Sequence, residues 1–110
     1  KAVNGSNILL LGVTYKANIR DDRETPAKPL AAALLDLGAE VCYFDPYVHL
    51  LQVGNVELRV EVDLNQAIQS ADIVVLLQPH DQIMKDAQFS NAKCVFDTRG
   101  ILTGDNVERL

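Results

Sequence analysis

The sequence predicts an α/β domain in which helices cover both faces of a mostly parallel sheet. Residues 8–11 and 73–77 are apolar throughout, as expected of strands that are buried on both faces. Strand-like runs alternate with helix-like runs along the chain, and this alternation indicates a parallel sheet joined by right-handed crossovers. The length of 110 residues fits one domain with a single core. We therefore expect a three-layer, doubly wound, Rossmann-like sheet in a single domain.

The first strand and the first helix carry the clearest local signals. Residues 8–11 form the expected first strand, and Gly12 marks its end. Thr25 offers an N-cap oxygen and Pro26 fits the first helical position. Apolar residues then recur at spacings of three and four, as on a helix that lies against a sheet. Gly38 is expected to end this helix.

The later elements follow the same alternation. A short strand rich in Val, Tyr and Phe ends at Asp45, which we interpret as a turn former. His80 is expected at the start of a helix, and His49 is expected to be exposed. The predicted strands are 40–44, 58–62, 72–77 and 93–96, and the predicted helices are 63–70, capped by Asp63, and 81–87.

Composition excludes several classes of function. The formal net charge is −5, whereas surfaces that bind nucleic acid are usually strongly basic. Cys42 and Cys94 lie in apolar runs without a CxxC spacing, so we expect buried thiols that serve neither a metal nor a redox centre. No segment reaches the apolar length of a membrane span. The first residue is Lys1, which suggests a piece of a longer protein.

The candidate binding residues lie in two separate loops. Ligands of such sheets bind outside the carboxyl ends of the strands, which places residues 13–24 and 97–100 on the same side. Gly12 stands alone, without the G-x-G-x-x-G pattern that lets a phosphate approach bare backbone. Positive charge must then come from side chains, and the candidates are Lys16, Arg20, Arg23 and Arg99.

These loops carry a resemblance to a known family. Residues 11–16 read LGVTYK, six residues follow, and residues 23–27 read RETPA. This pattern resembles the nucleotide-sugar 6-dehydrogenases (the UDP-glucose/GDP-mannose dehydrogenase family), specifically their carboxy-terminal, UDP-binding domain. The resemblance covers nearly the whole chain and continues through 38–41, 44–47, 71–72 and 97–100.

The resemblance implies a role within a larger enzyme. Family enzymes carry an NAD-binding Rossmann domain, a helical middle that builds the dimer, and this last domain. They oxidise a sugar C6 alcohol to a carboxylate through two hydride transfers to NAD, with an upstream cysteine as the nucleophile. Residues 1–6 would then be the end of a linker, and residues 7–110 the domain that binds the UDP-sugar. No catalytic residue and no metal ligand is expected within this chain.

Four residues take roles from the resemblance. Tyr15 matches the aromatic position that lies against the nucleotide sugar, and Lys16 matches the adjacent lysine that contacts the substrate. Arg99 matches the arginine that reaches the substrate from the loop after the last strand. Arg23 matches an arginine that contacts NAD across the cleft between domains. Arg20 occupies a variable family position and receives no role.

Each assignment has a simpler alternative. Lys16 and Arg20 fit solvated loop charges, and Arg23 fits a surface ion pair with a neighbouring acid. Tyr15 fits a side chain that packs under its own loop. Residues 97–100 fit a turn whose aspartate accepts backbone N–H groups.

Two other classes of protein share features with this sequence. A signalling receiver domain needs its acidic pair directly after the first strand, whereas Asp21 and Asp22 come nine residues after Gly12. A non-catalytic nucleotide-binding or assembly module remains the alternative. The expected partners are a UDP-sugar and the protein's own N-terminal and central domains, in a cytoplasmic homodimer or higher oligomer without nucleic-acid or membrane contact.

Overall fold

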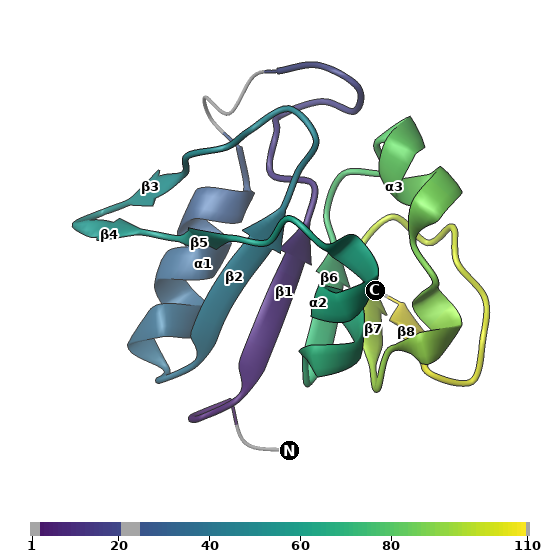
Figure 1. The fold of residues 1–110 in the computed structure, drawn as a ribbon. Coiled ribbons are helices and arrows are strands. Elements are labelled where there is room, and N and C mark those ends of the chain that lie inside the picture. The colour runs from purple at the N-terminus through teal and green to yellow at the C-terminus, as the bar shows by residue number, and fades with distance from the viewer. Residues whose placement is uncertain (1–2, 21–24, 110) are drawn as a thin grey trace.

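A single parallel sheet organises the domain (Figure 1). The computed structural model describes residues 3–20 and 25–109, and the following statements concern those residues. Every neighbouring pair of strands in the six-stranded sheet is parallel. The order is β5 (Arg59–Val60), β2 (Glu40–Phe44), β1 (Asn7–Leu11), β6 (Ile73–Leu76), β7 (Val95–Asp97) and β8 (Val107–Arg109).

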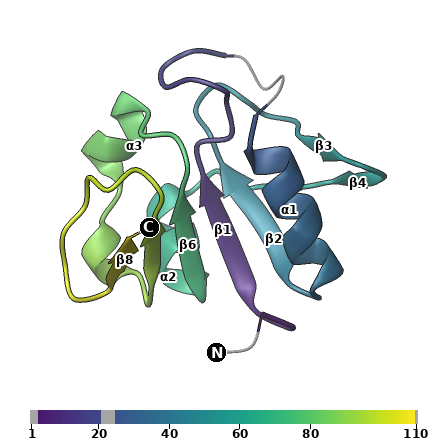
Figure 2. The same cartoon turned by 180° about the vertical axis from the view of Figure 1, so that it is seen from behind.

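Helices cover both faces of this sheet. Helix α2 (Leu64–Ser70) lies in front of the sheet in Figure 1, and α1 (Ala27–Asp36) lies in front of it in Figure 2, the view from behind. The side chains of β1 divide accordingly: Ile8 and Leu10 belong to the core that α1 covers, and Leu9 and Leu11 belong to the core that contains Ile68 of α2. The predicted three-layer α/β fold is confirmed.

Local chemistry sets the ends of α1. The Thr25 hydroxyl accepts a hydrogen bond from the Ala27 N–H at 3.2 Å, so Thr25 supplies the predicted capping oxygen, although the helix begins at Ala27, one residue later than expected. Gly38 has φ 89°. Its N–H and that of Ala39 bond to carbonyls of the last turn at 3.0 Å each, the pairing of a Schellman motif.

Three short elements were not predicted. They are a hairpin of β3 (Gln52–Val53) and β4 (Val56–Glu57), a 3₁₀ turn over Phe89–Asn91, and the edge strand β8. The three residues of β8 include only one apolar side chain, so pairing with β7 defines the strand and no sequence pattern announces it. Strand β7 begins two residues later than predicted, and β5 covers only two of the five residues expected there.

The remaining predicted elements are confirmed within one or two residues. Strand β2 has the expected bounds. Asp63 caps α2, because its carboxylate accepts the Gln66 N–H at 3.1 Å. Helix α3 (Asp81–Asp86) follows His80, which occupies its N-cap position as expected. None of the described helices is long and apolar enough to cross a membrane.

The strand order locates the candidate ligand edge. Counting only the strands of the large sheet, the spatial order is 3-2-1-4-5-6, the order of a dinucleotide-binding sheet. The direction of winding reverses between β1 and β6, and ligands of such sheets bind beyond the carboxyl ends of the strands at that point. The loops that follow β1, β6 and β7 leave from this edge, at the top in Figure 1.

Candidate functional site

The end of β1 packs tightly against the loop that follows β6. Gly12 has φ 80°, and a Cβ placed on it would lie 2.3 Å from the carbonyl oxygen of Gln78. The carbonyl of Leu11 accepts hydrogen bonds from the N–H groups of Leu77 and Gln78, at 2.9 and 3.2 Å. The bare backbone of Gly12 therefore faces the loop after β6, and it offers no phosphate cradle of the G-x-G-x-x-G kind.

A buried polar network lies under the loop that follows β1. The His80 side chain has no solvent exposure. Its Nδ1 accepts the Asn18 N–H at 2.7 Å. Its Nε2 lies 3.0 Å from Oδ2 of Asp45 and 3.2 Å from the Thr14 hydroxyl. These contacts join the loops that follow β1, β2 and β6.

Asp45 does more than form a turn. One carboxylate oxygen accepts the Tyr47 N–H at 2.7 Å, which is the predicted turn contact. The other oxygen accepts the Val13 N–H at 2.7 Å, 32 positions away in the sequence, in addition to the contact with His80. Asp45 therefore fixes the first residue of the loop that carries the candidate binding residues.

Tyr15 and Lys16 lie on the exposed side of this loop. The Tyr15 side chain is 48% exposed, so the alternative in which it packs under the loop is wrong. The Lys16 ammonium lies 5.9 Å from the centre of the Tyr15 ring, within cation–π range. The Tyr15 carbonyl accepts the Gln78 side-chain amide at 2.7 Å, and the Lys16 carbonyl accepts the Thr14 hydroxyl at 2.6 Å. These two hydrogen bonds fix the backbone of residues 15 and 16, while both side chains face solvent.

The turn that carries Arg99 is organised by a buried carboxylate. The Asp97 side chain accepts four backbone N–H groups, those of residues 99, 100, 101 and 102, at 2.7–2.9 Å. Burial alone would raise the pKa of Asp97, but the four donors outweigh burial and hold the pKa below its ordinary value. The turn alternative is thus confirmed for Asp97, and the exposed Arg99 side chain stands on a fixed backbone.

The fold places the two predicted cationic loops at one edge of the sheet (Figure 1). Neighbouring strands lie about 4.8 Å apart, so the ends of β1 and β7, with β6 between them, lie roughly 10 Å apart. Both Lys16 and Arg99 are exposed. Arg20 donates from Nε to the Tyr47 carbonyl at 2.7 Å, which braces the loop. Arg23 lies outside the described residues.

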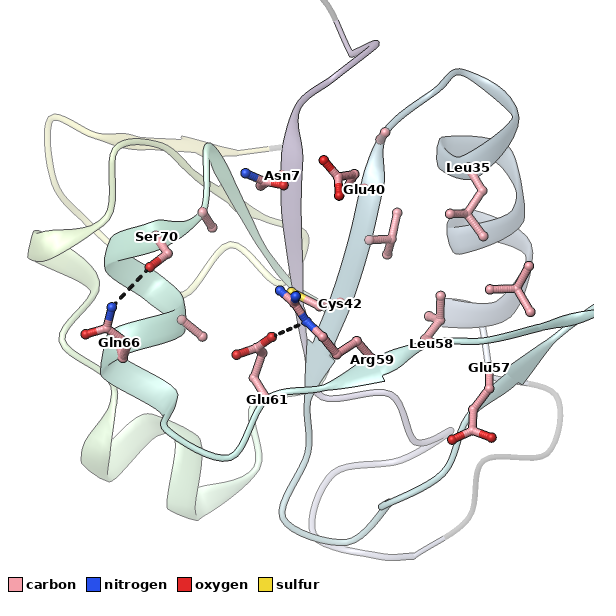
Figure 3. Close-up of a pocket in the computed structure, with 15 residues that line it drawn as sticks. Asn7, Leu35, Glu40, Cys42, Glu57, Leu58, Arg59, Glu61, Gln66 and Ser70 are labelled. Carbon is pink, nitrogen blue, oxygen red and sulfur yellow. Dashed lines mark hydrogen bonds and ion pairs between the residues drawn. The ribbon is translucent and has the colours of Figure 1, made fainter.

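A separate hollow lies toward the opposite end of β1 and β2. It has a volume of about 660 Å³ and is lined by Asn7, by Cys42 of β2 and by residues of α2. Figure 3 shows Arg59 beside Cys42, paired with Glu61 at 2.7 Å. Burial, and next the charge of Glu61, raise the pKa of the Cys42 thiol. Cys42 and Cys94 are free thiols as expected, but they are half-buried and therefore less buried than expected.

The network around His80 was not predicted as a unit. Asp45 follows β2 and His80 follows β6, the two strands that flank β1, and each lies in a sequence pattern that also fits a simple turn or a helix start. The only signal was topological: β2, β1 and β6 are adjacent, so their carboxyl-terminal loops meet. Within the described residues, no group of three or more potential ligands is arranged to hold a metal ion.

The chain is a Rossmann-like α/β domain whose candidate ligand edge carries the exposed cations Lys16 and Arg99 and has no glycine-rich loop after β1. A model of the UDP binding domain of the UDP-glucose/GDP-mannose dehydrogenase family matches residues 9–104. The chain belongs to this family and corresponds to its UDP-binding domain.

Individual relatives agree with this assignment. The chain is 32% identical over 111 residues to the UDP-N-acetyl-D-mannosamine dehydrogenase of Methanocaldococcus jannaschii, covering 93% of this chain and 24% of that protein. It is 34% identical to the NDP-N-acetyl-D-galactosaminuronic acid dehydrogenase of Ralstonia nicotianae, covering 91% and 24%. The structure of the UDP-N-acetyl-mannosamine dehydrogenase Cap5O from Staphylococcus aureus superposes with TM-score 0.67 at 29% identity, covering 98% and 26%. The chain thus spans about a quarter of these proteins.

Proposed function

We propose that this chain is the nucleotide-sugar-binding, carboxy-terminal domain of an NAD-dependent UDP-sugar 6-dehydrogenase. Residues 1–6 would end a linker from preceding domains, and residues 7–110 would form the binding domain. The observation that carries the proposal is the pair of loops with hydrogen-bonded backbones, one with Tyr15 and Lys16 and the other with Arg99, at one edge of a parallel sheet.

The chemistry of the edge suits a nucleoside diphosphate. Lys16 presents a compact ammonium charge and Arg99 a planar guanidinium fork, and both groups bind phosphate oxygens. The phenol ring of Tyr15, exposed beside Lys16, offers a flat apolar surface. Because the backbone under all three residues is hydrogen-bonded in advance, little ordering of the loops is needed when a ligand binds.

The remaining chemistry belongs to the longer protein. There, an upstream cysteine would act as the nucleophile, and NAD bound by a separate domain would accept the hydride in each of two successive steps that oxidise the sugar C6 alcohol to a carboxylate. Arg23 would contact NAD across the cleft between domains. A cytoplasmic homodimer or higher oligomer, with its own N-terminal and central domains against this one, completes the proposed assembly.

The names of the relatives indicate which sugar to test as the substrate. All three proteins described above are named for N-acetylated amino sugars. A UDP-N-acetylhexosamine is therefore the first substrate to test on the longer protein, with UDP-glucose as the comparison.

Titration of the 110-residue chain with UDP, followed by amide chemical shifts, tests the binding site. The expected shifts fall in residues 13–20 and 97–101, and substitution of Lys16 or Arg99 by alanine weakens them. Lys93→Ala is the matched control, because Lys93 precedes β7 at the opposite edge and pairs with Asp72 at 3.8 Å. Shifts that cluster around the hollow lined by Asn7, Cys42 and residues of α2 would contradict the proposed site.

The alternative, a non-catalytic nucleotide-binding or assembly module, differs in what precedes the domain. An upstream G-x-G-x-x-G segment and a cysteine nucleophile in the coding sequence would favour the enzyme. Reduction of NAD by the longer protein, dependent on a UDP-sugar, would decide between the two.

A further inference from the structure

We propose that His80 is a positioning residue for nucleotide-sugar binding: its neutral, Nε2-protonated ring fixes the backbone of residues 13–18 and thereby the directions of Tyr15 and Lys16. This inference rests on the proposed function for its ligand. The imidazole is fully buried and contacts the loops after β1 and β2. It therefore has no direct access to a ligand and acts only through the loop.

The hydrogen bonds determine the tautomer. Nδ1 lies 2.7 Å from the Asn18 nitrogen, whose N–H can only donate, so Nδ1 carries no proton. The Thr14 hydroxyl donates its proton to the Lys16 carbonyl at 2.6 Å, which leaves its oxygen as an acceptor toward Nε2. A carboxylate oxygen of Asp45 is the second acceptor near Nε2. Two acceptors at one nitrogen and a donor at the other assign the proton to Nε2.

The backbone beneath the binding side chains is fixed at both ends by this ring. At the start of the loop, Asp45 joins His80 to the Val13 N–H. At its end, Asn18 has φ 63°, which is rare for a residue other than glycine. Asn18 keeps this conformation with two bonds to the start of α3: its N–H bonds to His80, and its side-chain oxygen accepts the Asp81 N–H at 2.7 Å.

Loss of the Nδ1 acceptor would free the end of the loop. The Asn18 N–H would then lose its buried acceptor, and the left-handed conformation of Asn18 would lose a supporting bond. Tyr15 and Lys16, three and two positions away, would sample more directions. Binding of a nucleotide would then have to order them, which weakens affinity without removal of any group that touches the ligand.

Measurements on the unaltered chain test the first half of the proposal without any ligand. Nitrogen-15 NMR of the imidazole is expected to show a proton on Nε2 and none on Nδ1. The Asn18 amide is expected to exchange with solvent slowly, although the residue is exposed. A proton on Nδ1, or rapid exchange at Asn18, would overturn the assignment.

Two isosteric variants separate the roles of the two ring nitrogens. The side-chain oxygen in His80→Asn takes the place of Nδ1 and keeps an acceptor for Asn18, whereas the amide in His80→Gln takes the place of Nε2 and keeps the contact with Asp45. Slow Asn18 exchange and UDP affinity within about twofold are expected for His80→Asn, with fast exchange and about fivefold weaker binding for His80→Gln. His49→Gln, at an exposed histidine, is the control for the substitution itself.

The outcomes distinguish this inference from the proposed function. Equal losses in both variants, or affinity that follows thermal stability alone, would show that His80 only stabilises the fold and would overturn the inference. If the unaltered chain binds no UDP at all, the proposed function fails, while the ring protonation and Asn18 exchange still decide whether His80 fixes the loop. If both variants unfold, those two measurements on the unaltered chain still decide whether His80 fixes the loop, and a proton on Nδ1 or rapid exchange at Asn18 overturns the inference.

Discussion

Gly12 and Gln78 approach each other so closely that residue 12 has no room for a side chain: a Cβ there would lie 2.3 Å from the Gln78 carbonyl oxygen. The obstructing atom is backbone, and it belongs to the loop after β6, which cannot move without disturbing the start of α3. The lone glycine thus has a structural reason, close packing of two loops, that is independent of phosphate binding.

Gly12→Ala is therefore expected to destabilise the domain by at least about 2 kcal/mol, because strain at positive φ adds to a clash with backbone. Urea denaturation measures the loss. Gly5→Ala is the matched control: φ is +82° at Gly5 and +80° at Gly12, but nothing lies within 4 Å of a Cβ at residue 5. Equal losses in the two variants would mean that backbone strain alone is responsible and that the close contact with Gln78 matters little.

Arg99→Ala is expected to weaken UDP binding to the chain about tenfold, which corresponds to the roughly 1.4 kcal/mol of a lost charge-assisted contact. Isothermal titration at two salt concentrations measures the effect. The variant is also expected to show a smaller dependence of affinity on salt, since one cation fewer faces the phosphates. Arg59→Ala, which removes a guanidinium from the edge strand β5, is the control. Unchanged affinity for Arg99→Ala would remove Arg99 from the site.

Asp97→Asn is expected to cost about 2 kcal/mol of stability at pH 7, because the new amide group would face backbone N–H donors that now bond to a carboxylate oxygen. The folded-state pKa of Asp97 lies below its ordinary value, so the carboxylate contributes stability above about pH 3.9, the pKa of an unfolded aspartate, and loses it as pH falls through the folded pKa.

The difference in stability between the unaltered chain and Asp97→Asn should thus stay constant from about pH 5 to 7 and narrow below about pH 3.9. Denaturation series at several pH values measure it, with Asp105→Asn, at an exposed aspartate of the same connection, as control. A difference that grows on acidification would contradict the hydrogen-bonding role of Asp97.

Cys42 is expected to react with iodoacetamide at pH 8 more slowly in the folded chain than in the urea-unfolded chain. Burial, and then the negative charge of Glu61, raise the pKa of its thiol and so lower the fraction of reactive thiolate. Rates are measured in a Cys94→Ser background. Glu61→Gln should increase the folded-state rate, whereas Arg59→Gln, which removes the opposing cation, should reduce it. An opposite order of the two variants would contradict this electrostatic account.

The central part of the fold was predictable because each signal there is local. Unbroken apolar runs identified β1 and β6. Thr25 and Gly38 predicted where α1 begins and ends to within one residue. The edges were not predictable to the same degree. Strand β8 and the β3–β4 hairpin contain few apolar residues, and they exist because neighbouring strands supply hydrogen-bonding partners. Such tertiary pairing leaves little trace in a short sequence pattern.

The candidate site was likewise predictable only in part. The loops with Lys16 and Arg99 were predictable because parallel topology places strand ends on one side. The link between Asp45 and His80 depends on burial of both side chains, each of which has 0% exposure. Each residue alone also fits a common role in a turn or at a helix start, so only their spatial meeting distinguishes the network.

The sheet narrows toward its margins, from five residues in β1 and β2 to two in β5 and three in β8. An outermost strand exposes unpaired amide and carbonyl groups that can recruit a strand from another molecule, and its length sets how strongly it does so. With such short outermost strands, the domain offers little template for intermolecular β-pairing. High concentrations of the separate chain should therefore be attainable without fibrous or sheet-mediated aggregation.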